Sequence, residues 1–335
     1  MTVIAREKTV FLALAQFSHY SDVLRGQCIR TLAERYRVLV LTPVIDEAVA
    51  ERDGYFRQGS VSYVKLTLTH PKLFMFFDKY LRVPLVRELD HLVYMKYFYQ
   101  RPHWWARKLL MRLRVILPKR LLTTERLTRW EVRLAKPSRE FLKLCERHRP
   151  ALLVTATPGF TPFEAEMIIF AKNLGIKTIA IDVNYDNLTS TGKLMRKTDR
   201  LAVWNERMAK EARELHGYRD DNITIIGPIR FDHYFTDESD PYFRSRDEFL
   251  RSKGLNPEKK TIVYAGPTPS NYPPRREFML ELLRLRREKK VIGDPNILVR
   301  LHPNDSYALY REFENTPGLH IERAGRQVRS DAGGG

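Results

Sequence analysis

Cysteine is scarce in this chain of 335 residues: only Cys28 and Cys145 occur, and they lie far apart. Two distant cysteines exclude a disulfide scaffold and a cysteine-rich zinc site, and they suit a reducing cytoplasm. Long apolar runs are missing too, since no stretch approaches the roughly 18 to 20 apolar residues of a membrane-spanning helix. The short apolar run near the N-terminus lacks the cleavage site of a signal peptide. We therefore expect a cytoplasmic protein that is either soluble or peripheral to a membrane.

Acidic residues are too few to balance the basic ones. Lys and Arg number 58 against 40 Asp and Glu, which gives a net charge of +18. Such a surplus indicates an anionic partner, for example nucleic acid, a membrane surface, phosphates or an acidic polymer. More than half of the surplus, +11, lies in residues 101–150. One local surface must therefore account for most of the charge.

The region 72–148 combines this charge with many aromatic side chains. Within 103–117 apolar residues recur at helical spacing and basic residues cluster beside them, which is typical of a helix lying on an anionic membrane surface. An ordinary amphipathic helix packed on the core is the alternative. Nucleic acid is less favoured, because no RNP motif, zinc finger or helix-turn-helix is present. The residues expected at the membrane surface are Trp104, Trp105, Arg107, Lys108, Arg112 and Arg114.

Strands and helices are expected to alternate, with strands that are continuously apolar, so the pattern predicts an α/β fold with parallel sheets covered on both faces. The length predicts about two domains. The first domain is expected at residues 1–230, with 72–148 as a basic, aromatic helical insert. A linker at 231–258 and the start of a second domain at 259–335 follow.

Ligands of open α/β sheets bind at the carboxyl ends of the strands, so the loops that follow strands are the candidate sites. His19 and Asp22 follow the first predicted strand, in what we expect to be a polar loop before a helix at 23–35. Together they form a candidate general base and its orienting group. A helix cap beside an exposed histidine is the alternative.

Residues 182–193 follow a later strand, and eight of the twelve side chains can form hydrogen bonds even before Lys193 is counted. That density suits a polyhydroxylated ligand, although a polar surface turn has the same composition. After the strand at 261–265, Gly266 and Thr268 could offer a backbone N–H and a hydroxyl to a phosphate. Arg300 and His302 form a second phosphate-binding candidate, with a surface arginine and a strand-ending histidine as the alternative. No P-loop or dinucleotide fingerprint is present.

Four stretches resemble bacterial GT-B-fold glycosyltransferases that build cell-surface polysaccharides: YDNLT at 185–189, TDRLAVWNE at 198–206, IGPIRFD at 226–232 and VRLHPN at 299–304. The last is also similar to the polyglycerolphosphate transferases. The resemblance covers roughly residues 150–310. It implies two Rossmann-like domains with a cleft between them, of which the second is incomplete here. It also implies a nucleotide-sugar donor on the second domain, an acceptor (often lipid-linked) on the first, and no need for a metal or cofactor.

These observations predict a glycosyltransferase on the inner face of the plasma membrane. His19 or Asp22 is the expected base if the reaction inverts the anomeric centre, and Gly266, Thr268, Arg300 and His302 are expected at the donor diphosphate. The residues expected near the acceptor are Asp186, Asn187, Ser190, Asn205, Glu206 and Arg230. A glycerophosphate or other phospho-polyol transferase, and a non-catalytic membrane-surface scaffold, remain as alternatives.

Overall fold

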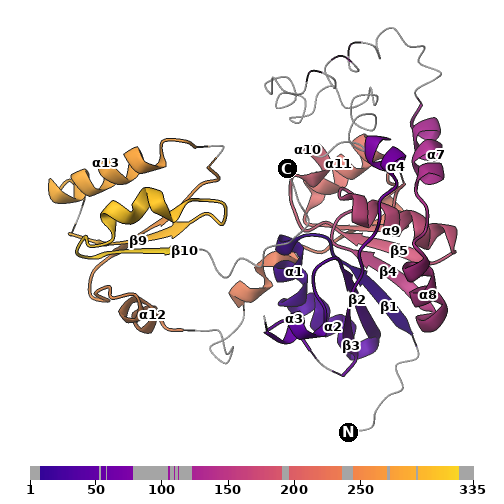
Figure 1. Cartoon of the computed structure of the whole chain (residues 1–335), viewed down its shortest axis with the longest axis horizontal. Helices are drawn as coiled ribbons and strands as arrows, with labels where there is room; N and C mark the ends of the chain where they lie inside the picture. Colours follow the sequence, from indigo (N-terminus) through magenta and orange to yellow (C-terminus); the bar gives the residue numbers. More distant parts are fainter. Residues whose placement is uncertain are drawn as a thin grey trace. The chain divides into compact units, whose positions relative to one another are not determined.

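The chain forms two compact units, Met1–Phe235 and Thr236–Gly335, and each is considered by itself (Figure 1). A computed structural model supplies the coordinates. The residues that it describes are 8–52, 54–57, 59–77, 105, 109, 112, 123–190, 196–235, 244–269, 272–291 and 293–323.

Seven parallel strands form the sheet of the first unit. In chain order they are β1 (Thr9–Ala13), β2 (Arg37–Thr42), β3 (Val61–Lys65), β4 (Pro150–Thr155), β5 (Lys177–Ile181), β6 (Arg200–Val203) and β7 (Ile223–Ile225). Their order across the sheet is β3-β2-β1-β4-β5-β6-β7. Strands β2 and β3 therefore extend the sheet from β1 in one direction, and β4 to β7 extend it from the other side of β1. The carboxyl edge between β1 and β4 is the place where open α/β sheets bind ligands.

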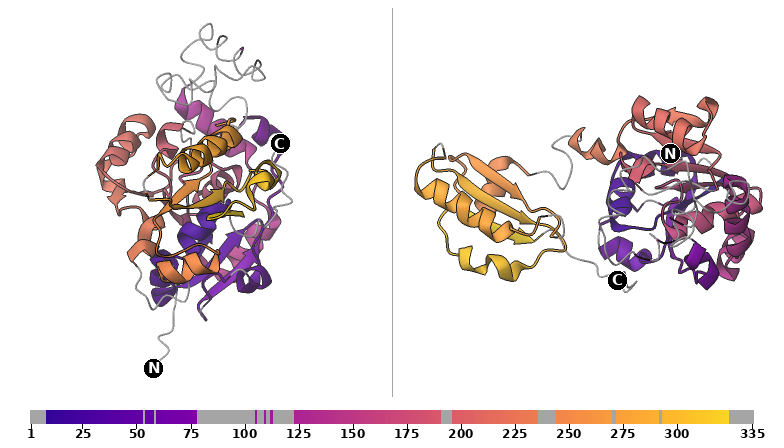
Figure 2. Two further views of the ribbon diagram at one scale, coloured as in Figure 1. Left: turned by 90° about the vertical axis from the view of Figure 1, so that its left-hand side faces the viewer. Right: turned by 90° about the horizontal axis from the view of Figure 1, so that it is seen from above.

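Helices lie on both faces of this sheet (Figure 2). They are α1 (Phe17–Leu24), α2 (Gln27–Arg35), α3 (Glu47–Arg52), α4 (Lys72–Phe76), α7 (Thr124–Leu134), α8 (Arg139–His148), α9 (Pro162–Asn173), α10 (Asn187–Ser190) and α11 (Glu206–His216), with the 3-10 helices η5 (Asp220–Asn222) and η6 (Ile229–Phe235). Alternate residues of β1 enter two cores: Val10 and Leu12 pack in one, Phe11 and Ala13 in the other. Burial on both faces is why the strands are continuously apolar.

Helix α9 is buried on nearly all sides. Thr161 caps its N-terminus and Pro162 occupies the first turn, where a missing N–H costs nothing. The helix nevertheless carries two carboxylates, Glu164 and Glu166, and both are buried. Buried carboxylates need partners, and those of Glu164 define the candidate site below.

The prediction that His19 and Asp22 lie in a polar loop is wrong, because the chain is already helical from Phe17. The helix predicted at 23–35 is split at Gly26, where a Cβ would lie 3.2 Å from the carbonyl oxygen of Asp22. This close approach lets the chain turn between α1 and α2. His19 consequently lies on a helix and is buried, not exposed on a loop.

The second unit has a three-stranded parallel sheet in the order β10-β9-β8. Its elements are α12 (Arg246–Ser252), β8 (Thr261–Ala265), α13 (Arg275–Arg287), β9 (Asn296–Leu301), η7 (Tyr307–Phe313) and β10 (Leu319–Arg323). The core lies between the sheet, α13 and η7, with Met279, Val299 and Tyr310 fully buried. The α/β fold with two parallel sheets, expected from the strand–helix alternation, is confirmed.

Candidate functional site

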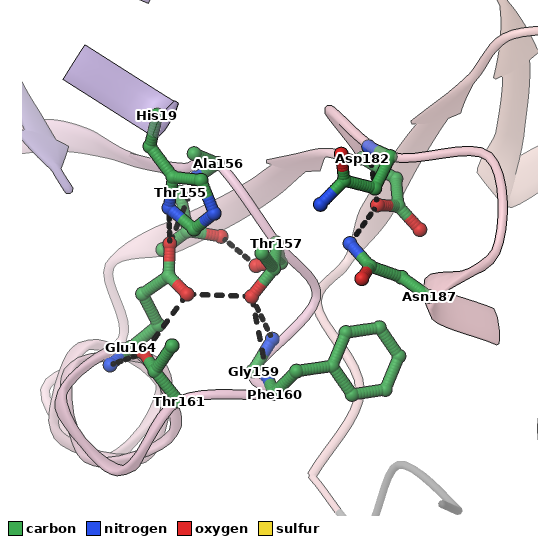
Figure 3. Close-up of polar contacts among 11 residues, drawn as sticks. His19, Thr155, Ala156, Thr157, Gly159, Phe160, Thr161, Glu164, Asp182 and Asn187 are labelled. Atoms are coloured by element: carbon green, nitrogen blue, oxygen red, sulfur yellow. Dashed lines mark hydrogen bonds and ion pairs between the residues drawn. The ribbon is translucent and has the colours of Figure 1, made fainter. Parts of the chain in front are cut away.

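Three titratable side chains gather at the carboxyl edge of the first sheet (Figure 3). His19 comes from α1 after β1, Glu164 from α9 after β4, and Asp182 directly follows β5. All three are at most 1% exposed. The Nδ1 atom of His19 lies 3.7 Å from Oε1 of Glu164. The switch point of the sheet therefore holds a buried histidine–carboxylate pair.

Hydrogen bonds fix the carboxylate of Glu164. The hydroxyl of Thr157 donates to Oε2 at 2.5 Å, and the hydroxyl of Thr161 donates to the same atom at 2.9 Å. The N–H of Ala156 donates to Oε1 at 3.2 Å. The loop between β4 and α9 thus wraps around one carboxylate and leaves Oε1 facing His19.

Burial shifts both members of this pair toward their neutral forms. It raises the pKa of Glu164 to about 7, although the hydrogen bonds from Thr157, Thr161 and Ala156 oppose the rise. Burial also lowers the pKa of His19 to about 4, with a smaller contribution from the positive charge of Arg230. Near pH 7 the imidazole is therefore neutral and able to accept a proton, beside a carboxyl group close to its own titration midpoint.

Asp182 adds a second buried carboxyl group at this edge. Its Oδ1 accepts hydrogen bonds from the Asn187 side chain at 2.6 Å and from the Asn184 N–H at 3.3 Å. Its Oδ2 is buried and forms no hydrogen bond within the described part of the chain. Burial raises the pKa of Asp182 to about 8, so this carboxyl group is mostly protonated at neutral pH.

Arg230 joins the segments that follow three different strands. Its guanidinium donates to Oδ1 of Asn184 at 3.0 Å and lies 3.5 Å from the carboxylate of Asp22. Asp22 therefore pairs with Arg230, whereas His19 pairs with Glu164. The sequence expectation that Asp22 orients His19 finds no support in this geometry.

The other residues expected near the acceptor lie in different settings. Asp186 is exposed, whereas Asn187 is buried against Asp182. The side chain of Asn205 caps α11 by accepting from the N–H of Met208, and Glu206 is exposed in the first turn. The side chain of Ser190 lies outside the described residues. Asp186, Asn187 and Arg230 are thus brought to one region, and the other roles stay predictions.

A row of four aromatic rings runs along the same edge. The centroid distances are 6.2 Å for Tyr185–Trp204, 5.9 Å for Trp204–Phe231 and 5.8 Å for Phe231–Tyr234. The indole N–H of Trp204 donates to the carbonyl oxygen of Asp182 at 2.8 Å, which fixes the ring. Tyr185 and Tyr234 are 66% and 73% exposed. Exposed aromatic side chains gathered beside buried titratable groups indicate a ligand-contacting surface.

In the second unit, Gly266, Thr268 and His302 meet where β8 and β9 end. The N–H of Gly266 donates to the carbonyl oxygen of Arg300 at 2.7 Å, and a Cβ at Gly266 would lie 3.2 Å from the nitrogen of His302. The N–H of Asn304 donates to Nδ1 of His302 at 3.1 Å, so Nε2 carries the proton in the neutral ring. That proton points to the hydroxyl of Thr268 at 3.3 Å.

Arg300 faces a different neighbour. Its guanidinium lies 3.5 Å from the carboxylate of Glu322 on β10, which also pairs with Lys253 at 2.6 Å. The side chain of Arg300 is 57% exposed, so its charge is only partly engaged. Its expected contact with a phosphate therefore stays a prediction.

A buried ion pair holds the two loops of this unit together. The Nε atom of Arg275 lies 3.0 Å from the carboxylate of Asp305, and the side chains are 10% and 0% exposed. Arg275 also donates to the carbonyl oxygens of Pro269 and Tyr272 at 3.0 Å each. The loop that carries Thr268 is thereby tied to the loop after His302.

We expect Arg275→Met to destabilise the second unit by roughly 3 kcal/mol, because it leaves the carboxylate of Asp305 buried without its charge partner. Urea unfolding followed by circular dichroism, with hydrogen exchange over residues 266–274, measures the loss. Arg276→Met is the matched control, since its pair with Glu312 is exposed and we expect little change. Equal midpoints for the two variants would contradict the structural role of Arg275.

Most residues assigned to the membrane surface lie outside the described part of the chain, namely Trp104, Arg107, Lys108 and Arg114. Trp105, Leu109 and Arg112 are helical and exposed, with Trp105 at 70%. No helix among the described residues is long and apolar enough to cross a membrane.

Sequence reasoning missed Glu164, Thr157 and Arg275. Thr161-Pro162-Phe163-Glu164 does match a capping box, a signal for the start of a helix. Thr161 forms that cap, but the carboxylate of Glu164 bonds to the preceding loop and faces His19. Nothing in the capping pattern distinguishes a carboxylate that only caps from one that also enters a site.

Comparisons with known proteins place the fold. No protein-family model and no curated protein matches the sequence. The UDP-GlcNAc 2-epimerase of Neisseria meningitidis, solved with UDP-GlcNAc, is similar in structure with a TM-score of 0.53 and 9% identity, over 95% of this chain and 72% of that one. Another UDP-N-acetylglucosamine 2-epimerase has a TM-score of 0.52 and 12% identity, over 95% of this chain and 69% of that one. The MnaA protein of S. aureus, solved with UDP, has a TM-score of 0.50 and 9% identity, over 94% of this chain and 69% of that one. The chain therefore has a GT-B-like fold, as expected from the sequence.

Proposed function

We propose that this protein uses a nucleotide-sugar, and that it transfers the sugar to a saccharide acceptor. The observation that carries the proposal is the buried His19–Glu164 pair at the switch point of a GT-B-like sheet. A neutral histidine next to a fixed carboxylate is the arrangement of a general base with its positioning group.

His19 acts as the base through Nε2, because Nδ1 faces Glu164. Nε2 takes the proton of an acceptor hydroxyl while the acceptor oxygen forms a bond to the anomeric carbon. The bond from that carbon to the nucleoside diphosphate breaks, and its electron pair leaves with the diphosphate. Glu164 stabilises the imidazolium that results. Attack opposite the leaving group inverts the anomeric centre.

The second unit supplies the donor-binding groups in this proposal. Gly266 and Thr268 approach the diphosphate through the loop after β8, and His302 donates from Nε2. Arg300 adds a positive charge, and its attraction to the leaving group increases as negative charge develops there.

The aromatic row and Arg230 form the acceptor side. Sugar rings present C–H faces and hydroxyl edges, and the row offers ring faces next to the hydrogen-bonding side chains of Asp186, Asn184 and Arg230. A lipid-linked acceptor would be presented at the cytoplasmic face of the plasma membrane, where the protein would work as a peripheral enzyme.

We expect wild-type protein to bind at least one of UDP-N-acetylglucosamine, GDP-mannose and CDP-glucose in calorimetry. Arg300→Ala should weaken binding by more than about tenfold, since a charge-assisted contact to phosphate is lost. Glu322→Gln removes the competing carboxylate and should bind at least as tightly as wild type. Arg284→Ala, on the exposed face of α13, is the control. Failure of the wild type to bind any of the three would overturn the proposal.

A nucleotide-sugar epimerase is the second candidate, because the similar structures with TM-scores above 0.5 include UDP-GlcNAc 2-epimerases. Inverting a carbon that carries hydrogen requires removal and return of a proton, and His19, Glu164 and Asp182 provide several acid–base groups. Incubation with UDP-N-acetylglucosamine in D2O separates the candidates by NMR. Deuterium in the sugar ring with a new epimer identifies an epimerase, whereas UDP and free or transferred sugar without deuterium identify a transferase.

A further inference from the structure

Helices α4 and α7 lie side by side (Figure 1). Both expose large apolar side chains. Leu73 and Phe76 of α4 are 67% and 51% exposed, and Trp130 of α7 is 41% exposed. Phe74, between the first two, is fully buried in the core beneath α4. The helix therefore packs on the core through Phe74 and the partly buried Met75, and the other three of its five side chains are exposed.

Basic side chains frame these apolar ones. Lys72 begins α4, and Arg129 and Arg133 lie on either side of Trp130 along α7; all three are exposed. Of the two acidic residues of α7, Glu131 is buried, and Glu125 lies in the first turn. The α4/α7 surface, defined as Leu73, Phe76, Trp130, Lys72, Arg129 and Arg133, is thus apolar with a positive rim.

We propose that the α4/α7 surface docks on a bilayer that contains anionic lipids. The apolar side chains would enter the boundary between headgroups and acyl chains, where Trp and Phe are favoured. The arginines and the lysine would lie at the level of the lipid phosphates, which attract juxtamembrane basic groups. This charge complementarity selects an anionic lipid surface over a neutral one.

The same surface is joined to the candidate site. Nδ1 of His70, just before α4, lies 2.6 Å from the carboxylate of Glu166 on α9. Two residues earlier on α9 is Glu164, the partner of His19. Helix α4 also follows β3, so it starts from the carboxyl edge of the sheet. A membrane held at α4 and α7 would thus lie near the edge where a lipid-linked acceptor has to react. The inference adds a partner to the proposed function, and its test needs no nucleotide-sugar.

Flotation with unilamellar vesicles tests the proposal on the full chain. We expect binding to vesicles of phosphatidylcholine with about one third phosphatidylglycerol, and little binding to pure phosphatidylcholine. Binding to the anionic vesicles should fall markedly at about 0.5 M salt, because salt screens the attraction between the basic side chains and the lipid phosphates. Absence of binding to the anionic vesicles would overturn the proposal. So would equal binding to both compositions, since it would leave the basic rim without a role.

Variants locate the docking surface. We expect two double variants to weaken binding to the anionic vesicles by at least about tenfold each. The first combines Leu73→Ser with Phe76→Ser, and the second combines Arg129→Gln with Arg133→Gln. Phe278→Ser combined with Leu280→Ser is the matched control, because these side chains of α13 are 40% and 41% exposed. Circular dichroism checks that each variant is folded. Wild-type binding by both α4/α7 variants would refute this location, even if the protein binds membranes elsewhere.

Discussion

His19→Ala should lower the turnover of the nucleotide-sugar by about 10²- to 10⁴-fold, the range typical of a lost general base. The side chain is nearly fully buried, and its only charged neighbour within ion-pair distance among the described residues is Glu164. The loss should appear in kcat more than in KM, because the proton is transferred in the transition state. Release of the nucleoside diphosphate, measured in a coupled assay with acceptor present, gives both constants.

Glu164→Gln separates a positioning role from a purely structural one. In the wild type, the carboxylate that stabilises the imidazolium forms as pH rises through about 7, the raised pKa of Glu164. Turnover should therefore increase between pH 6 and pH 8, and Glu164→Gln should be slower and flat over the same range. If His19 and Glu164 act as a unit, the double variant His19→Ala/Glu164→Gln should be about as slow as His19→Ala alone.

A histidine remote from this edge controls for general damage. His148, at the end of α8 before β4 starts, lies against Phe11 with ring centroids 6.3 Å apart. His148→Ala should keep wild-type turnover. If His19→Ala retained wild-type turnover, the proton would have to pass to another group, and the proposed role of His19 would be wrong.

Much of this arrangement could be predicted from local sequence patterns. Continuous apolar strands such as 10–13 and 152–155 indicate a parallel sheet, and a ligand edge follows from that topology. His19 could be singled out because it follows the first strand. Its partner could not, because the distance between positions 19 and 164 depends on β1 and β4 being neighbours. Strand order is a property of the whole fold, so no local pattern states it.

The neighbours of Asp22 and of Arg300 could not be predicted from the local sequence. Asp22 is three residues from His19, which suggested a contact, but Arg230 after β7 competes for its carboxylate. Arg300 and His302 are two residues apart, a spacing that puts side chains on one face of a strand. Strand β9 ends at Leu301, however, and the two side chains have different neighbours: Glu322 for Arg300 and Thr268 for His302. In both cases a long-range contact, Arg230 or Glu322, decides where the side chain points.

The pH dependence of stability should reveal the buried carboxyl group of Asp182. Burial raises its pKa to about 8 in the folded state, whereas in the unfolded chain it titrates near pH 4. Between these values the folded state binds more protons than the unfolded state, so the free energy of unfolding falls as pH rises. One fully linked proton gives a slope of about 1.4 kcal/mol per pH unit. Glu164 contributes in the same direction up to about pH 7.

His19 acts in the opposite direction but at lower pH. Its pKa is lowered to about 4 by burial and by the charge of Arg230, so the folded state binds fewer protons there than the unfolded state. Its contribution to stability therefore increases with pH until roughly 6.5, the unfolded value, and is constant above that. Between pH 7 and pH 8 Asp182 therefore gives the largest of the three contributions, because Glu164 is already past its midpoint and His19 is mostly neutral in both states.

Asp182→Asn should remove most of the fall in unfolding free energy between pH 7 and pH 8, since an amide cannot ionise and only the smaller contribution of Glu164 is left. Wild-type stability should fall by roughly 1 kcal/mol between pH 7 and pH 8, and that of the variant should fall less and approach or exceed that of the wild type at higher pH. All four tryptophans lie between positions 104 and 204, so tryptophan fluorescence in urea titrations reports only the first unit. Asp186→Asn, an exposed neighbour, should run parallel to the wild type. Parallel curves for Asp182→Asn and wild type would mean that Asp182 is ionised in the folded protein, and the account of a buried, protonated carboxyl group at this edge would fail.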